Sequence, residues 1–210
     1  MAPATPTFSS SIAVEATLPP TSPISSRPVG AIDPWLSAAE IADAVRSRTL
    51  PAAAVTAAAL DRIGRLDGRL NAFLAVSDQA AAVAAGIDAG AERSGTLCGV
   101  PVAIKDLTDT AGLVTTYGSA LYRDHVPKED DLVVARLRAA GAVIVGKTMT
   151  PEFGFGAICA NPLRPATANP WNLALTSGGS SGGAAAALAA GLTGLEAGSD
   201  IGGSIRGPAH

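Results

Sequence analysis

Residues 130–146 read DDLVVARLRAAGAVIVG, and this stretch indicates the fold class of the chain. The paired aspartates at its start are typical helix-capping residues, and they predict a helix over 132–140 that ends at Gly141. The apolar run that follows, 142–145, is rich in β-branched residues and predicts a buried strand. A helix–strand unit of this kind is typical of an α/β fold.

Features on both sides of this unit support the same fold class. On the N-terminal side, the apolar run 100–104 predicts a second buried strand, and Lys105 follows it directly. On the C-terminal side, a Gly/Ser turn at 177–183 leads into a helix predicted over 184–190, and a second glycine-rich turn covers 198–203. Strands that alternate with helices across glycine-rich turns predict an α/β fold with a largely buried sheet.

The segment before residue 95 has the apolar spacing of a layer of helices and carries no sign of chemistry. A capping box at Ser37 and Glu40 predicts the start of a first helix, and Pro51 lies in the first turn of a second helix that runs to about Arg65. Residues 71–76 predict a strand or a helical turn. Ser77 then caps a third helix that ends near Gly95.

The first 29 residues differ in composition from the rest of the chain. They hold six of the fifteen prolines and many Ser and Thr, and no Lys or Arg precedes Arg27. Such a composition predicts a disordered extension rather than a secretory signal, which needs a basic start and an apolar run. We therefore expect the folded part to comprise residues 30–210.

The composition also excludes several classes of protein. A net charge of −3 and a pI near 5.3 are unlike the basic character of a nucleic-acid binder. With two cysteines, Cys98 and Cys159, and two histidines, the chain lacks the side chains for a disulfide framework or a histidine metal site. The longest apolar stretch, 184–195, is shorter than the ~20 residues that span a membrane. We expect a cytoplasmic protein with reduced thiols and no metal.

Two sequence motifs suggest functions that their context disfavours. Residues 141–148 match the phosphate-binding pattern G-x-x-x-x-G-K-[ST], but the four central residues are strand formers and Pro151 follows where a helix should begin. Residues 178–182 match the G-x-S-x-G turn of α/β-hydrolases, which needs a later histidine. The only later histidine is His210, the last residue, and a terminal histidine is hard to hold as a base.

A third pattern joins a lysine to serines in glycine-rich turns. Ser180 and Ser181 lie in the first turn and Ser204 in the second, and a serine hydroxyl needs a base before it becomes a good nucleophile. Lys105, one of three lysines, ends a strand of Val, Ala and Ile, where burial would favour the neutral amine and allow it to act as that base. Alternatively, Lys105 caps the strand and reaches water.

Glycines beside Ser204 suggest the other half of an acyl-transfer site. Such a reaction builds negative charge on a carbonyl oxygen, which backbone N–H groups stabilise when they already point at it. Gly202 and Gly203 allow consecutive amides to form an anion-binding nest, although a tight turn is the alternative explanation.

At these residues the sequence resembles the amidase signature family of serine hydrolases. The resemblance implies an α/β fold with a mixed β-sheet core flanked by helices. It covers about half the chain in separated blocks, which are GVPVAIKD at 99–106, GKT at 146–148, EF at 152–153, NPWN at 169–172, GGSSGG at 178–183 and GSDIGGSIRGPA at 198–209.

The resemblance also implies roles for individual residues. Ser204 would be the nucleophile, Ser180 a bridging serine that follows a cis peptide bond, and Lys105 the base, with no metal or organic cofactor. The supporting set would comprise the backbone amides of Ile201, Gly202, Gly203 and Ser204 as the oxyanion hole, Asp200 paired with Arg206 to hold that loop, and Ser181.

The chain departs from the family pattern in length and at two positions. Family members continue for about as many residues again, so residues 30–210 would be the N-terminal portion of the domain, apparently truncated after the nucleophile. Ala184 stands where a serine is frequent, and Met149 where asparagine is common.

The function that the resemblance implies is hydrolysis of a small-molecule carboxamide to a carboxylate and ammonia through an acyl-serine. Alternatives are a glutamyl- or aspartyl-tRNA amidotransferase A-type subunit with partner subunits, or an inactive fragment. We expect no nucleic-acid or membrane partner outside the amidotransferase case, and a homodimer is an open alternative.

Overall fold

The computed structural model describes residues 32–90 and 94–210, of which Ile32–His210 forms a compact unit. The extension expected over residues 1–29 lies outside the described residues. No helix in the described part of the chain is both long and apolar enough to span a bilayer.

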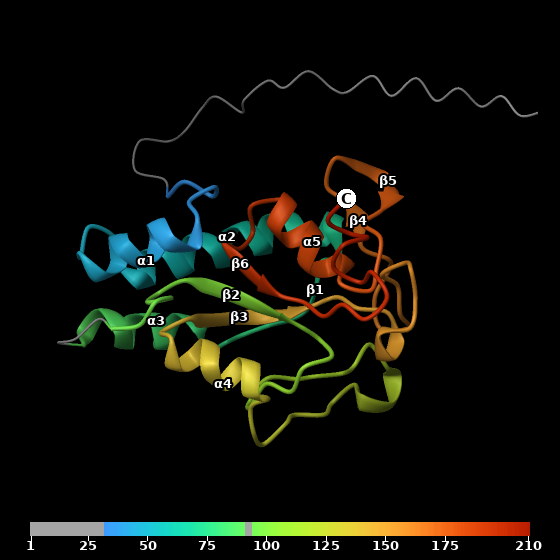
Figure 1. The fold of residues 1–210 in the computed structure, drawn as a ribbon, viewed down its shortest axis with the longest axis horizontal. Helices are drawn as coiled ribbons and strands as arrows, with labels where there is room; N and C mark the ends of the chain where they lie inside the picture. The colour runs from blue at the N-terminus through green and yellow to red at the C-terminus, as the bar shows by residue number, and fades with distance from the viewer. Residues whose placement is uncertain (1–31, 91–93) are drawn as a thin grey trace, which may run out of the picture. The chain divides into compact units, whose positions relative to one another are not determined.

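A four-stranded sheet forms the centre of this unit (Figure 1). Strand β2 (Pro101–Lys105) lies parallel to β3 (Val143–Thr148) on one side and to β6 (Leu195–Ala197) on the other. Strand β1 (Phe73–Val76) pairs with β3 in the antiparallel direction. The sheet is therefore mixed, with the order β1-β3-β2-β6, and the expected α/β fold class is confirmed.

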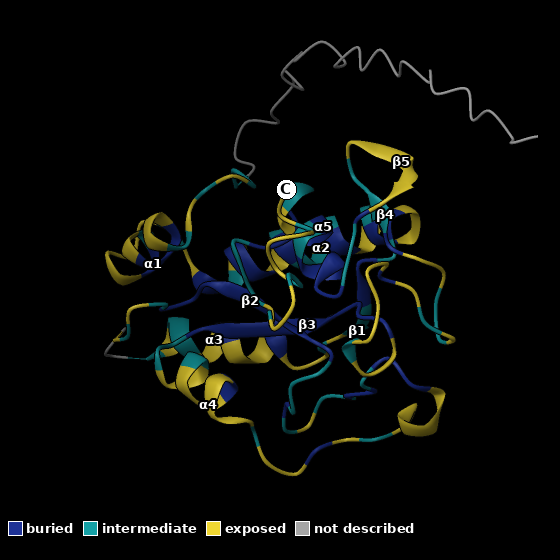
Figure 2. Ribbon diagram, turned by 45° about the vertical axis from the view of Figure 1, so that its right-hand side comes forward, coloured by how far each residue is buried: buried dark blue, intermediate teal, exposed yellow. Residues whose placement is uncertain are grey.

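Helices cover both faces of this sheet. Figure 1 shows α1, α2 and α5 on one side and α3 and α4 on the other. The two central strands are buried along their whole length, so that most of the core lies around β2 and β3 (Figure 2). The helices, in chain order, are α1 (Ala38–Arg46), α2 (Ala52–Leu70), α3 (Ala80–Ala89), α4 (Leu132–Ala139) and α5 (Gly182–Ala189).

Local capping signals predicted the starts of two helices, α1 and α4, correctly. The capping box at Ser37 and Glu40 is present, with both reciprocal hydrogen bonds. Asp131 caps α4 as predicted, and Gly141 follows that helix with a φ of +88°. Pro51 lies one position earlier than expected, as the N-cap of α2 rather than in its first turn.

Two helix ends differ from the prediction. Helix α2 continues past Arg65 to Leu70 because its buried face continues through Asp67 and Leu70, and Asn71 then ends it in the left-handed conformation. Helix α3 ends at Ala89 rather than near Gly95, and Ser77 lies two residues before its N-cap, where its hydroxyl accepts from the Gln79 amide.

Strand β3 ends three residues later than predicted, at Thr148, and it contains most of the apparent phosphate-binding pattern. Gly146 is required there, because a Cβ would come within 3.0 Å of the Phe73 ring and would collide with the Ala75 carbonyl. Since residues 143–148 are extended and paired on both sides, the pattern is a buried strand and not a phosphate loop.

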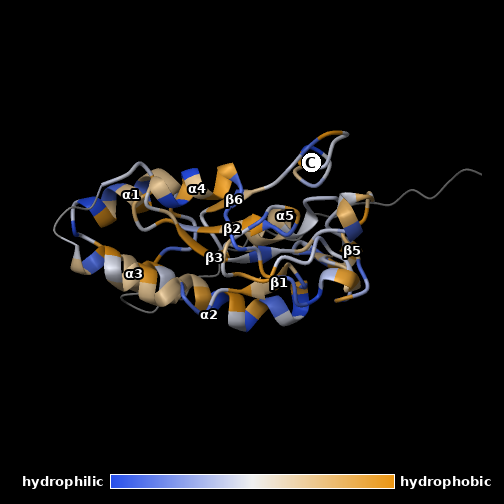
Figure 3. Cartoon of the chain, turned by 90° about the horizontal axis from the view of Figure 1, so that it is seen from below, coloured by the Kyte–Doolittle hydropathy of each residue, from blue (hydrophilic) through white to orange (hydrophobic). Residues whose placement is uncertain are grey.

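The remaining elements lie around the C-terminal ends of β2 and β3. Figure 3 shows apolar residues concentrated along the sheet and the helix faces that cover it. Two 3₁₀ turns (Ala120–Tyr122 and Glu152–Gly154) and the hairpin of β4 (Ala168–Asn169) and β5 (Asn172–Thr176) complete the described chain.

Candidate active site

Lys105 lies at the C-terminal end of β2 and is almost completely buried, with 1% of its surface exposed. Its Nζ donates to Ser180 Oγ at 2.7 Å and to Ser199 Oγ at 2.9 Å. Of the two interpretations left open by the sequence, burial is therefore correct, because the side chain turns inward and not toward water.

The environment of Lys105 favours its neutral form. Burial lowers the pKa of this lysine from 10.5 to about 8, because the ammonium loses hydration. The charges that Cys159 and Asp200 carry when ionised act in the opposite direction. Near neutral pH, an amine with this pKa is in the neutral form, which can take up a proton, in a far larger fraction of molecules than an ordinary lysine.

The turn that carries Ser180 is built from close backbone contacts. The peptide bond between Gly179 and Ser180 is cis, as the resemblance implied. A Cβ on Gly179 would lie 2.9 Å from the Gly156 carbonyl, and one on Gly182 would lie 2.7 Å from Cys159 Cβ. Only glycine fits at these positions, so the turn holds Ser180 in a narrow space against Lys105.

Ser181 connects this turn to the segment that follows β6. Its hydroxyl donates to the Ser199 carbonyl at 3.1 Å and accepts from the Ser199 amide at 3.3 Å. Its own amide donates to the Ser204 carbonyl at 3.0 Å. Ser181 thereby holds Ser199 and Ser204 beside the Lys105–Ser180 pair.

Asp200 organises the second glycine-rich turn. Arg206 donates to both of its carboxylate oxygens, at 3.0 and 2.8 Å, so the expected pairing of these two side chains is present. The amides of Gly203, Ile205 and Arg206 also donate to this carboxylate. The Arg206 hydrogen bonds, followed by those from the backbone, hold the pKa of Asp200 well below its ordinary value.

The hydroxyl of Ser204 lies in this turn and is partly exposed. Within residues 32–90 and 94–210, no hydrogen bond joins the Ser204 side chain to Ser180. The Gly203 amide is occupied by Asp200 at 2.8 Å. In the same part of the chain, the amides of Ile201, Gly202 and Ser204 donate to no hydrogen-bond acceptor.

Ser199 is a site residue that the sequence did not single out. It follows β6, a strand of only three residues that was not predicted. Because β6 lies parallel to β2, their C-terminal ends meet at one edge of the sheet, and Ser199 reaches Lys105 there. The signal that could have identified it is its position next to Asp200 in the GSD triplet.

Cys159 also lies beside the site and is fully buried as a free thiol. Its Sγ is 4.0 Å from the Ser180 carbonyl oxygen. Burial raises the pKa of this thiol, so Cys159 remains neutral at pH 7 and acts as a packing residue behind the turn.

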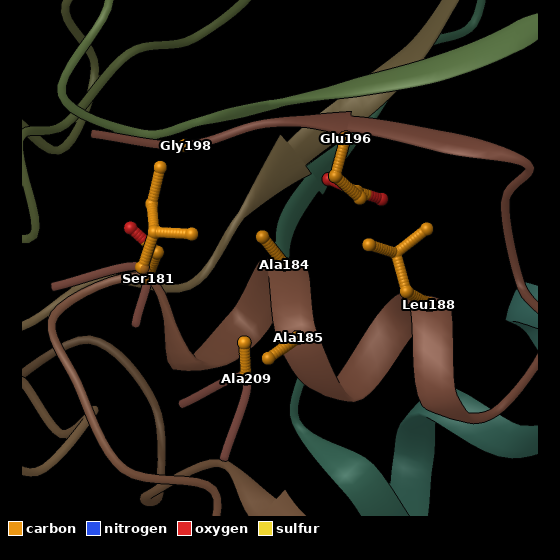
Figure 4. Close-up of a pocket in the computed structure, with 8 residues that line it drawn as sticks. Ser181, Ala184, Ala185, Leu188, Glu196, Gly198 and Ala209 are labelled. Carbon is orange, nitrogen blue, oxygen red and sulfur yellow. The ribbon is translucent and has the colours of Figure 1, made fainter. Parts of the chain in front are cut away.

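A cavity of about 110 Å³ opens next to Ser181, between α5 and β6 (Figure 4). Figure 4 shows Ser181 and Glu196 at its two ends, with Ala184 between them. The Glu196 carboxyl accepts from Thr193 Oγ1 at 2.6 Å, and burial raises its pKa to about 8. The walls are otherwise mainly apolar, with Ala185, Leu188 and Ile205 among the lining residues.

The donor groups of this site suit acid–base and acyl-transfer chemistry. In the described residues no group of three or more His, Cys, Asp or Glu side chains is arranged to hold a metal ion. What converges instead is a buried amine, two hydroxyls that it touches, and a turn with free amides next to a third hydroxyl.

Comparisons with known proteins match most of this chain. A family model described as Amidase matches residues 54–210. The A-type subunit of the glutamyl-tRNA(Gln) amidotransferase of Salinispora arenicola is 49% identical over 177 residues, which are 82% of this chain and 36% of that protein. The chain therefore spans about a third of the length of the curated relatives it matches.

Solved structures with the same fold include enzymes named for amide cleavage. A fatty acid amide hydrolase superposes with a TM-score of 0.80 at 30% identity, covering 84% of this chain and 32% of its own. A bacterial aryl acylamidase, described as an amidase signature enzyme, gives a TM-score of 0.79 at 34% identity and covers 83% of this chain and 37% of its own.

Proposed function

The chain belongs to the amidase family, and we propose that Lys105, Ser180 and Ser204 form a serine-hydrolase site that cleaves a carboxamide to a carboxylate and ammonia. The observation that carries this proposal is the buried 2.7 Å contact between Lys105 Nζ and Ser180 Oγ. A buried amine bonded to a hydroxyl is the arrangement needed to take up a proton from a serine.

In the acylation step, Ser204 Oγ attacks the amide carbon. Its proton moves to Ser180 Oγ while the Ser180 proton moves to the neutral Lys105 amine. The oxygen of the tetrahedral intermediate is stabilised by the free amides of Ile201, Gly202 and Ser204. When the C–N bond breaks, the proton returns along the same route to the leaving nitrogen, and ammonia departs.

In the deacylation step, water attacks the acyl-Ser204 ester and gives its proton to the same Ser180–Lys105 pair. The C–O bond to Ser204 then breaks, the proton returns to Ser204 Oγ, and the carboxylic acid leaves and gives its remaining proton to solvent or ammonia, which yields the carboxylate. Lys105 is thus a base in the first half of each step and an acid in the second, which suits a pKa of about 8.

The surrounding residues support this relay by fixing its members. We propose that Ser199 orients Lys105, since its hydroxyl accepts from the same Nζ at 2.9 Å. Ser181 fixes the Ser204 backbone through a hydrogen bond. The Asp200–Arg206 pair stabilises the conformation of the second glycine-rich turn, which carries the proposed oxyanion hole. The cavity beside Ser181 is the place where the apolar part of an acyl group would begin.

A second candidate function is that of an amidotransferase component, and the names of the curated relatives favour it. The same site would then release ammonia for transfer to an aminoacyl-tRNA, and partner subunits would be required. The tagged chain, isolated from its own cells, should then bring partner subunits with it and support amidation of a charged tRNA. A simple amidase would purify alone or as a homodimer, in the cytoplasm, and release ammonia from small amides.

Active-site labelling separates a working site from an inactive fragment. A fluorophosphonate should form one adduct on Ser204 of the chain, with none on Ser204→Ala and a much slower reaction on Ser180→Ala. The absence of any adduct on the folded chain would contradict the proposed function.

A further inference from the structure

A second buried lysine, Lys147, lies on the strand next to Lys105. In the β2–β3 ladder, Lys105 is paired with Thr148, and Ile104 with Lys147. Because neighbouring residues of a strand face opposite sides of the sheet, the two lysines point to opposite faces. Lys147 is fully buried, and the proposed relay makes no use of it.

Lys147 binds the segment that directly follows Lys105, residues 106–119. Its Nζ donates to Thr110 Oγ1 at 3.0 Å, to Thr115 Oγ1 at 2.9 Å and to the Thr108 carbonyl. Figure 1 shows this segment on the side of the sheet opposite to α5. All three donor positions of the ammonium are thereby used to hold one loop.

Asp106 supplies the charge that balances this ammonium. It is fully buried, and its Oδ1 lies 3.8 Å from Lys147 Nζ and has no hydrogen-bond partner in the described part of the chain. Its Oδ2 accepts from the Thr116 hydroxyl at 2.5 Å and from the Thr116 amide at 2.9 Å. Burial of this charged pair thus costs desolvation free energy, and its side-chain hydrogen bonds go to one segment, residues 106–119.

The segment held by this pair contacts residues 152–154, which lie next to Ser180. The Tyr117 carbonyl accepts from the Phe153 amide at 2.7 Å, and Ser119 donates to Glu152 at 2.6 Å. A Cβ on Gly154 would lie 3.7 Å from Ser180 Oγ and 2.7 Å from Leu107 Cδ1. The held segment therefore packs against residues 152–154, which in turn lie against Ser180.

We propose that Lys147, paired with Asp106, is a positioning residue that keeps segment 106–119 packed against residues 152–154, which lie against Ser180, and so keeps water away from the Lys105–Ser180 contact. This inference rests on the proposed function, because it assigns Lys147 to the same relay. Lys147 touches neither the substrate nor the reacting serines, and it acts through the loop that it binds.

Different charged groups affect the pKa values of the two lysines. Asp106, Asp109 and Asp130 act on Lys147, whereas Cys159 and Asp200 act on Lys105. Since burial is the largest cause of the lowered pKa of Lys105, opening of segment 106–119 raises that pKa toward 10.5.

The test uses the variant pair Lys147→Met and Asp106→Asn in one chain. The double variant keeps the cluster neutral and removes the clamp, so no unpaired charge remains buried. The chain has only three lysines, and NMR of ε-¹³C-labelled lysine can follow Lys105 through a pH titration in each variant. We expect the Lys105 midpoint to rise by about one pH unit or more in the double variant.

Lys128→Met is the matched control, because Lys128 is an exposed lysine outside segment 106–119. It should leave the Lys105 midpoint unchanged. Thr115→Val, which removes one acceptor of Lys147, should raise the midpoint by a smaller amount in a chain that folds normally. A Lys105 midpoint that stays near 8 in both the double variant and Thr115→Val overturns the proposal.

Labelling of Ser204 separates this proposal from the proposed function. Fluorophosphonate labelling of the double variant should slow by about tenfold or more relative to the unmodified chain. If the unmodified chain forms no adduct while the Lys105 midpoint still shifts in the double variant, the hydrolase function fails and the positioning role stands.

Discussion

If Lys105 is the base for Ser204, as proposed, its lowered pKa should make the rate of Ser204 labelling depend on pH in a specific way. With a pKa of about 8, roughly one lysine in ten is neutral at pH 7, whereas with the ordinary value of 10.5 the fraction is about one in 3,000. Burial therefore raises the amount of usable base by about 300-fold at neutral pH. The second-order rate of fluorophosphonate labelling should follow the neutral fraction.

The neutral fraction of Lys105 sets the shape of the pH profile of labelling. Between pH 6 and 7 the labelling rate should rise about tenfold, between pH 7 and 8 about fivefold, and above pH 9 by less than twofold. The rate is measured by intact-mass spectrometry of the adduct at a series of pH values. Ser204→Ala corrects for labelling elsewhere in the chain.

Replacement of Lys105 by Met tests the same assignment from the other side. The variant should label at least about 100-fold more slowly at pH 8 and lose the rise between pH 6 and 9. A profile in Lys105→Met that stays parallel to that of the unmodified chain would refute the role of this amine as the base.

The same variant should gain stability. Below pH 8 the buried ammonium costs the folded state roughly 3 kcal/mol, and this cost disappears between pH 8 and 10.5, where the unfolded chain binds more protons than the folded one. Lys105→Met should therefore unfold at higher denaturant concentration than the unmodified chain at pH 7, and the difference should shrink as the pH approaches 10.5.

Three other perturbations have expected outcomes. Ser199→Ala removes one of the two hydroxyls that hold Lys105, so fluorophosphonate labelling of Ser204 should slow by about five- to twentyfold at pH 7 without loss of fold. An unchanged labelling rate would show that Ser199 does not contribute to the site. Gly183→Ala should lower the free energy of unfolding by about 2–4 kcal/mol, because its Cβ would lie 2.6 Å from the Ala72 carbonyl oxygen. Gly64→Ala, in the open middle of α2, should raise the free energy of unfolding by up to about 1 kcal/mol. Urea unfolding compares the two variants, and equal effects would contradict the close packing of α5. Glu196→Gln should have the same melting temperature as the unmodified chain near pH 5 and an increasingly higher one up to pH 8. The reason is that the folded chain keeps a proton on Glu196 that the unfolded chain releases above pH 4.5. A difference in melting temperature that does not change with pH would indicate that Glu196 is not buried.

The elements with strong local signals were predicted well from the sequence. Strand β2 and helix α4 were recognised because an apolar run and a capping aspartate are interactions among neighbours in the chain. Helix α2 was predicted too short because Gly64 and Gly68 weaken a helix locally, and only its packing through Ile63 and Leu70 compensates for this. Strand β6 was missed because three residues carry too little pattern.

What the sequence determined by itself was the inventory of chemistry: a lysine at the end of an apolar strand, serines in glycine-rich turns and no usable histidine. Which of these groups meet was decided by the tertiary structure, because Lys105, Ser180 and Ser199 are brought together from β2, the turn before α5 and the segment after β6. Pairing of β6 beside β2 creates the Lys105–Ser199 contact. Lys147 contacts segment 106–119 only when β3 lies next to β2. Burial, which lowers the pKa of Lys105, is a property of the assembled layers and of no single segment.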